Sequence, residues 1–164
     1  MEMKENDLKV FTELIKGSRR SDRELAKAAK VSQPTVTRIR TKLERQGFIR
    51  EYTLIPDLMK MGYELVAFTF LSFGEDRPEH IQQAREWVKK QPCIIFTNDG
   101  EGMEMNSIMI SIHKDYTSYT TLITQLKRDW QPNLRTVQTF LVSLERSDLT
   151  IKQFSFRSLL ANES

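Results

Sequence analysis

Side chains that could hydrogen-bond to bases recur at helical spacing in the segment SQPTVTRIRTKLER, from Ser32 to Arg45. At 100° per residue, Val36, Ile39 and Leu43 share one face, which predicts contact with a core. The opposite face carries hydroxyl and basic groups and no acid at its five most outward positions: Pro34, Thr37, Arg38, Thr41 and Arg45. Arginine, hydroxyl and amide groups are the ones that read base edges in the major groove of DNA. We therefore expect DNA contacts from nine residues: Gln33, Pro34, Thr35, Thr37, Arg38, Arg40, Thr41, Lys42 and Arg45.

Two roles are expected within this set. Arg38 lies in the first half of the helix and should reach base edges, whereas the later cations Arg40, Lys42 and Arg45 should lie nearer phosphates. The competing interpretation is a solvated amphipathic helix without a ligand, as most charged helix faces are.

The neighbouring sequence predicts how this helix is held. Ser21 and Glu24 have the spacing of a capping box, and Ser32 can cap the next helix. Gly47 stands where a residue with positive φ commonly ends a helix. An earlier helix, capped by Asp7 and ending near Gly17, completes a three-helix unit. The alternation from Phe48 to Ile55 predicts a strand pair, or wing, after it.

Charge is uneven along the chain. Residues 1–50 hold 13 Lys and Arg against 7 Asp and Glu, a net of +6. Residues 51–164 hold 12 against 15, a net of −3, which recovers the overall +3. A basic region favours phosphate binding, so the N-terminal third is expected to contact DNA and the remainder to serve another purpose.

Several classes of protein are disfavoured by composition. The one cysteine, Cys93, allows no intramolecular disulfide and no cysteine-based zinc site. His80 and His113 are too few and too far apart for a metal cluster, so we expect no metal and no cofactor. His113, at a strand end, is either a surface residue or an effector contact. The N-terminus lacks a signal-peptide core, and the longest apolar run, 65–71, is too short for a bilayer. The expectation is a soluble cytoplasmic protein with no membrane contact.

Beyond Gly62 the pattern changes to alternating strands and helices. The expected strands are 64–73, 93–98, 105–113 and 136–144, and the expected helices are 78–91 and 116–130. A glycine-bearing turn is expected at Asp99 to Gly102. The order βαββαβ predicts an α+β fold, a ferredoxin-like sandwich with both helices on one face of an antiparallel sheet. We expect a DNA-binding domain at 1–56, a linker at 57–63, the sandwich domain at 64–147 and a C-terminal extension at 148–164.

The first and last strands of this sheet are apolar on both faces, although two helices can cover only one. The residues expected on the uncovered face are Val66, Phe68, Phe70, Phe140 and Val142. A large exposed apolar face marks an interface, which predicts a homodimer through the sheets. The alternative is that the apolar C-terminal segment 149–160 folds back over that face.

The stretch from Ser32 to Asp57 resembles the recognition helix and wing of the leucine-responsive regulatory protein family (Lrp/AsnC). The resemblance extends from Leu8 to about Leu144. It implies a transcription regulator with a winged or plain helix-turn-helix, which binds double-stranded DNA as a dimer, tetramer or octamer. It also implies a small effector, typically an amino acid, bound between C-terminal domains.

The family's effector loop has an Asp in the region that reads DGEGMEMN here, from Asp99 to Asn106, where Glu104 or Asn106 takes its place. We expect the amides of Gly100 and Gly102 to receive a carboxylate, and Glu104 or Asn106 to accept from an ammonium group. A solvated hairpin without a ligand is the alternative.

Two other functions fit the same fold. A sirohaem decarboxylase-like enzyme would use the sandwich domain as a tetrapyrrole pocket, but it would need converging basic and histidine side chains. A sequence-independent, chromatin-like protein would share the basic N-terminal third. The hydroxyl-rich, basic helix favours a regulator over the enzyme.

Overall fold

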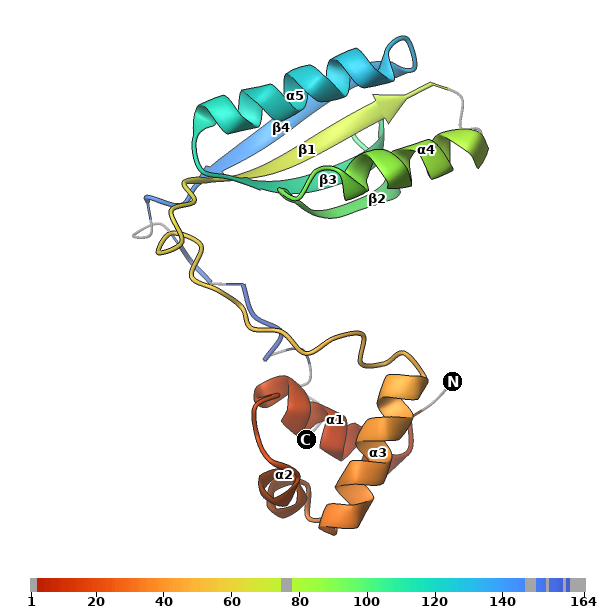
Figure 1. Ribbon diagram of the computed structural model, residues 1–164, viewed down its shortest axis with the longest axis vertical. Coiled ribbons are helices and arrows are strands. Elements are labelled where there is room, and N and C mark those ends of the chain that lie inside the picture. Colours follow the sequence, from red (N-terminus) through yellow and green to blue (C-terminus); the bar gives the residue numbers. More distant parts are fainter. Residues whose placement is uncertain (1–2, 75–77, 147–149, 153, 158, 160–164) are drawn as a thin grey trace. The chain divides into compact units, whose positions relative to one another are not determined.

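The computed structural model describes residues 3–74, 78–146, 150–152, 154–157 and 159. The chain divides into two compact units, one of Met1–Ile55 with Lys152–Ser164 and one of Pro56–Ile151 (Figure 1). We call the first the helix-turn-helix unit and the second the sandwich unit. Among the described residues, none of the helices has the length and apolar character needed to cross a membrane.

Three helices build the helix-turn-helix unit: α1 (Glu5–Lys16), α2 (Asp22–Ala29) and α3 (Gln33–Arg45). Each contributes an apolar face to one core. The buried members are Val10, Leu14, Leu25, Ala26, Ala29, Val36, Ile39 and Leu43. The predicted inward residues of α3 are at most 1% exposed, so the helical period assigned to this segment is confirmed.

The helix ends follow the predicted chemistry at three places. Ser21 Oγ accepts from Glu24 N at 3.3 Å, and Glu24 Oε2 accepts from Ser21 N at 2.8 Å, which is a complete capping box. Ser32 Oγ caps α3 by accepting from Thr35 N. Gly47 has a φ of 76°, and the amides of Gly47 and Phe48 bond to the carbonyls of Glu44 and Leu43. This Schellman ending satisfies two carbonyls of the last turn.

Two expectations for this unit are wrong. Asp7 does not cap α1: the helix begins at Glu5 after Lys4, and Asp7 lies buried within its first turn. The strand pair expected between Phe48 and Ile55 is absent, because residues 49–57 form neither helix nor strand in this chain. Alternation alone predicted the strands, and no described residue pairs with this segment in a sheet.

The sandwich unit has the predicted βαββαβ order. Its elements are β1 (Leu65–Phe73), α4 (Pro78–Lys89), β2 (Ile94–Gly102), β3 (Met105–His113), α5 (Tyr116–Trp130) and β4 (Leu134–Ser143). The strands form one antiparallel sheet in the order β2-β3-β1-β4. Both helices lie on the same face of this sheet (Figure 1), where Leu71 and Met109 pack against Leu122, Leu126 and Trp130. The ferredoxin-like fold is therefore confirmed.

The hairpin between β2 and β3 turns later than expected. Gly100 and Gly102 belong to β2, and Gly102 pairs with Met105. The turn consists of Met103 and Glu104, whose φ values are 54° and 61°. Two positive φ values match a type I′ hairpin turn, whose twist suits the flanking strands. The glycines suggested the turn from sequence, but the side-chain-bearing residues after them occupy the left-handed positions.

His113 is buried, at 2% exposure, and so is not the surface residue that its place at a strand end suggested. Its Nε2 lies 2.8 Å from Ser111 Oγ, and its ring packs edge-on against Tyr119 with 5.6 Å between centroids. Burial lowers the pKa of His113, and the nearby Asp115 acts in the opposite direction. The imidazole is thus a satisfied core group.

Candidate nucleic-acid interface

The outward face of α3 is exposed along the whole helix. Six of the nine predicted contact residues are exposed: Gln33, Pro34, Thr37, Arg38, Thr41 and Arg45. The other three, Thr35, Arg40 and Lys42, are half-buried. Because Val36, Ile39 and Leu43 fix the opposite face in the core, the exposed side chains are presented on a rigid element. This arrangement can place hydroxyl and guanidinium groups against base edges.

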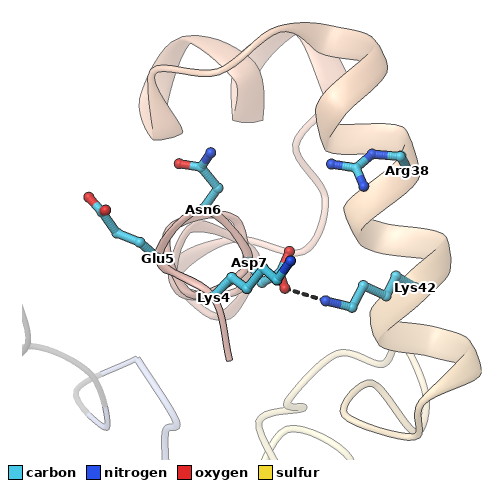
Figure 2. A pocket seen from close by; sticks show the side chains of 6 residues that line it. All are labelled: Lys4, Glu5, Asn6, Asp7, Arg38 and Lys42. Carbon is cyan, nitrogen blue, oxygen red and sulfur yellow. Dashed lines mark hydrogen bonds and ion pairs between the residues drawn. The ribbon is translucent and has the colours of Figure 1, made fainter. Parts of the chain in front are cut away.

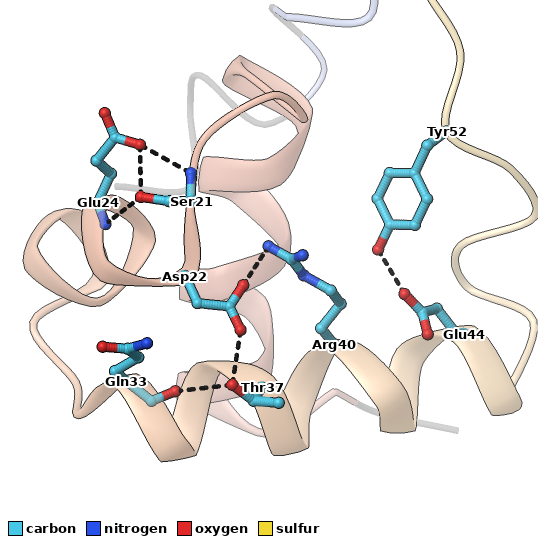
Figure 3. Close-up of polar contacts among 8 residues, drawn as sticks. All are labelled: Ser21, Asp22, Glu24, Gln33, Thr37, Arg40, Glu44 and Tyr52. Carbon is cyan, nitrogen blue, oxygen red and sulfur yellow. Dashed lines mark hydrogen bonds and ion pairs between the residues drawn. The ribbon is translucent and has the colours of Figure 1, made fainter.

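Asp22 joins α2 to α3 through two of the predicted contact residues (Figure 3). Its Oδ2 accepts from Thr37 Oγ1 at 2.6 Å, and its Oδ1 lies 2.5 Å from Arg40 Nη2. The Nε and Nη2 atoms of Arg40 are buried without a well-aligned hydrogen bond among the described residues, so charge attraction dominates this pair. Arg40 is therefore paired with Asp22 inside the unit and is not the free cation that we expected near a phosphate.

Lys42 is also engaged. Its Nζ lies 2.5 Å from Oδ2 of Asp7, whose side chain is 7% exposed. The pair borders an open hollow of ≈ 450 Å³ between the first turn of α1 and the middle of α3 (Figure 2). Arg38 lines the same hollow and has no bonded partner in the described part of the chain. Of the cations expected on α3, Arg38 and Arg45 are thus the two that are exposed and have no bonded partner among the described residues.

Tyr52 fixes the segment that follows α3 (Figure 3). Its hydroxyl donates to Glu44 Oε1 at 2.7 Å. Burial, followed by the hydrogen bond to Glu44, raises the pKa of Tyr52 to about 12. The neutral phenol is therefore retained at physiological pH and keeps residues 49–52 against the C-terminal turn of α3.

No pattern in the sequence indicated that these three acids are structural partners. Asp22, Asp7 and Glu44 each bind a side chain outside their own helix turn, at separations of 15, 35 and 8 residues. Helical periodicity reports the face on which a residue lies, and it does not report which side chain of another element lies opposite.

The residues predicted to bind an effector are only partly available. Gly100, Gly102 and Glu104 are exposed around the β2–β3 turn. Asn106 is not free, because its Oδ1 accepts from Phe73 N at 2.9 Å and its Nδ2 donates to Phe73 O at 3.1 Å. The side chain of Asn106 therefore ties β3 to the end of β1 instead of facing a ligand. Among the described residues, no group of three His, Cys, Asp or Glu side chains could hold a metal ion.

The uncovered face of the sheet carries the predicted apolar residues in transverse rows. Across β2, β3, β1 and β4, one row contains Phe96, Ile110, Phe68 and Phe140. A second row contains Ile112, Val66 and Val142, and a third contains Asn98, Ile108, Phe70 and Gln138. Phe140 is 66% exposed, so no described residue covers this end of the face.

The C-terminal segment offered as an alternative cover is itself exposed where it is described. Ile151, Phe154 and Phe156 all have exposed side chains, while Leu149 lies outside the described residues. The described part of the segment therefore gives no support to its folding back over the sheet.

Helix-turn-helix geometry with an exposed polar recognition helix, joined to a ferredoxin-like sandwich, defines a class of DNA-binding regulators. Comparisons with known proteins agree. Residues 3–50 match a family model described as winged helix-turn-helix DNA-binding. The chain is similar to the transcriptional regulator LrpC of Bacillus subtilis, at 44% identity over 62 residues, covering 38% of this chain and 43% of that protein.

A second relative is the leucine-responsive regulatory protein of Escherichia coli, at 32% identity over 98 residues, covering 57% of this chain and 59% of that protein. The chain thus spans about half the length of these relatives. A transcriptional regulator from Neisseria meningitidis, solved as a complex with L-Met, has a TM-score of 0.81 at 16% identity and covers 99% of this chain and 100% of its own. That likeness shows the fold. The chain has the fold of the Lrp/AsnC regulators and resembles members of that family in sequence.

Proposed function

We propose that this chain is a sequence-specific DNA-binding transcription regulator that acts as a homodimer. The observation that carries the proposal is the exposed face of α3, where Arg38 and Arg45 stand unpaired among described residues beside Thr41 and Gln33. The core residues of the same helix hold that face rigidly, and the net charge of +6 in residues 1–50 favours phosphates. All the relatives named above are described as regulators, which supports this function over the decarboxylase.

The test is to bind the purified protein to fragmented genomic DNA and to sequence the bound fraction. A sequence-specific regulator should enrich a short motif with two-fold symmetry, because a symmetric dimer presents the same helix twice. Enrichment of all fragments in proportion to their abundance would contradict the proposal and would favour the chromatin-like alternative.

The uncovered sheet face supports dimerisation. Its central row of Phe96, Ile110, Phe68 and Phe140 is apolar across all four strands, whereas the third row ends in Asn98 and Gln138. An apolar centre with a polar margin is typical of protein interfaces. We place the dimer contact on Val66, Phe68, Phe70, Phe140 and Val142, and include further assembly into tetramers or octamers in the proposal.

Light scattering at micromolar protein concentration measures the oligomeric state directly. Phe68→Asp places a charge at the centre of the face and should yield monomers that bind the operator weakly, because each half-site alone contributes part of the affinity. Gln138→Asp adds the same charge at the margin of the same face and should remain dimeric. A monomeric wild type, or equal behaviour of the two variants, would contradict the sheet interface.

An amino acid effector is also part of the proposal, since a regulator of this fold was solved with L-Met. The amides of Gly100 and Gly102 could bind a carboxylate, and Glu104 could bind an ammonium group. Asn106 is left out because its amide is bonded to Phe73. A ligand shifts the equilibrium between two assembly states of the protein only if it binds one of them more tightly than the other.

A thermal-shift screen of the common amino acids tests the effector. Glu104→Ala should remove the response of the protein to its effector and leave DNA binding intact. Glu101→Ala, which removes an exposed acid from the neighbouring strand, is the matched control. A screen in which no amino acid raises the melting temperature would count against this ligand class.

A further inference from the structure

The hydroxyl of Thr37 is held from two sides on the exposed face of α3 (Figure 3). Its Oγ1 donates to Asp22 Oδ2 at 2.6 Å and lies 3.2 Å from the carbonyl oxygen of Gln33. A carboxylate oxygen and a carbonyl oxygen can only accept hydrogen bonds. A hydroxyl has a single proton, so whichever neighbour receives it, none remains for a third partner. What Thr37 presents to solvent is an acceptor lone pair.

Asp22 cannot easily turn away from Thr37. Its second oxygen lies 2.5 Å from Arg40 Nη2, and its side chain is 19% exposed. Asp22 is also the first residue of α2, directly after the N-cap Ser21 and within the capping box that Ser21 forms with Glu24. A negative charge is favoured at this end of a helix by the exposed backbone amides. The carboxylate is therefore fixed by its own helix and by α3 together.

We infer that Asp22 makes Thr37 a specificity-determining residue that accepts a hydrogen bond from a base amino group. The inference rests on the proposed binding of α3 in the major groove. Adenine N6 and cytosine N4 are donors there, whereas guanine N7 and O6 and thymine O4 are acceptors. At the base that Thr37 faces, adenine or cytosine is selected and guanine or thymine is disfavoured. One neutral hydrogen bond gives a preference of about two- to tenfold.

Selection from a randomised duplex library tests the inference with three proteins. The wild type should enrich a motif that contains adenine or cytosine at one position of each half-site. Thr37→Val keeps the shape of the side chain and removes the acceptor, so it should lose the preference at that position alone, by about two- to tenfold. Thr37→Ser keeps the hydroxyl and should retain the preference.

A second pair of variants, Asp22→Asn and Glu44→Gln, separates the hydrogen bond that Asp22 accepts from Thr37 from the effect of its negative charge. In Asp22→Asn the side-chain amide can donate to Thr37 Oγ1, which leaves the hydroxyl proton held only by the longer, 3.2 Å contact with the carbonyl oxygen of Gln33. The preference at the same position should then spread to guanine and thymine. Glu44→Gln removes one negative charge from the same helix surface without touching Thr37, and its motif should equal that of the wild type.

Three results would overturn the inference. They are a motif unchanged by Thr37→Val, a guanine or thymine at the position that Thr37→Val affects, and an unchanged preference in a folded Asp22→Asn protein. Thermal melting shows whether each variant folds, and the two Thr37 variants decide the question if Asp22→Asn does not. A wild type that enriches no motif contradicts the proposed function itself, which is a different outcome from any of these three.

Discussion

Replacing Arg38 by alanine should separate base reading from general attraction to DNA. Arg38 is exposed on the outward face of α3, in the half of the helix that follows the Ser32 cap. It lines the hollow beside Asp7 and Lys42, which are bonded to each other. Since no described residue is bonded to Arg38, the substitution breaks no contact within the unit. We expect the free energy of unfolding to change by no more than about 0.5 kcal/mol.

The effect on binding follows from the number of hydrogen bonds that a guanidinium can make. A bidentate arginine contact to guanine contributes about 1–3 kcal/mol of discrimination. Arg38→Ala should therefore weaken binding to the preferred site by roughly ten- to a hundredfold for each half-site. Binding to a scrambled duplex should weaken much less, because Arg38 is expected to meet base edges and not phosphates.

Arg45→Ala is the matched control, because it removes the same charge from the last turn of the same face. Loss of a phosphate contact should weaken binding to both duplexes alike and reduce the salt slope by about 0.9. Fluorescence anisotropy with the preferred and the scrambled duplex, at several salt concentrations, measures all of these quantities. If Arg38→Ala weakened both duplexes by the same factor, the assignment of Arg38 to base reading would be wrong.

Three further predictions concern stability. Leu43→Ala empties a fully buried position of the helix-turn-helix core and should lower the free energy of unfolding by about 2–5 kcal/mol in urea titration. Asp7→Ala leaves the Lys42 ammonium, 30% exposed, without its carboxylate and should lower the same quantity by about 1–3 kcal/mol; no loss would mean that the pair contributes nothing. Burial lowers the pKa of His113 below its ordinary 6.5, so the unfolded chain binds the proton more tightly than the folded one. The folded protein is therefore at full stability above pH 6.5, where His113 is neutral in both states, and should lose stability as pH falls through the folded pKa. His113→Gln should remove this pH dependence of the melting temperature in melting curves recorded between pH 8 and pH 5.

The sequence predicted most of the fold because the signals were local. The capping box of Ser21 and Glu24 involves groups three residues apart, and the burial of Val36 and Ile39 follows from one helical period. Alternation within each strand assigned Phe68 and Phe140 to the same sheet face in the same way, and in the structure the two residues stand opposite each other. Each of these features depends on residues that are close in the chain or on a period that extends over a whole element.

Two of the mistaken expectations depend on distant partners. Asp7 binds Lys42, 35 residues later, instead of capping α1. Asn106 binds Phe73, 33 residues earlier, instead of a ligand. Side chains that can bind a ligand can equally bind a neighbouring element, and only the packing of the chain decides between these uses.

The β2–β3 turn offers a place to attach a spectroscopic probe. Met103 is 66% exposed, and the pairing of Gly102 with Met105 fixes the backbone on both sides of it. A Met103→Cys substitution would present a thiol there with the same backbone strain that methionine already bears. The native Cys93 is half-buried, and burial raises the pKa of its thiol, so it forms the reactive thiolate less readily at neutral pH. Maleimide dyes should therefore label the turn first, and a fluorophore would stand next to Glu104, where changes in its surroundings can be followed in real time.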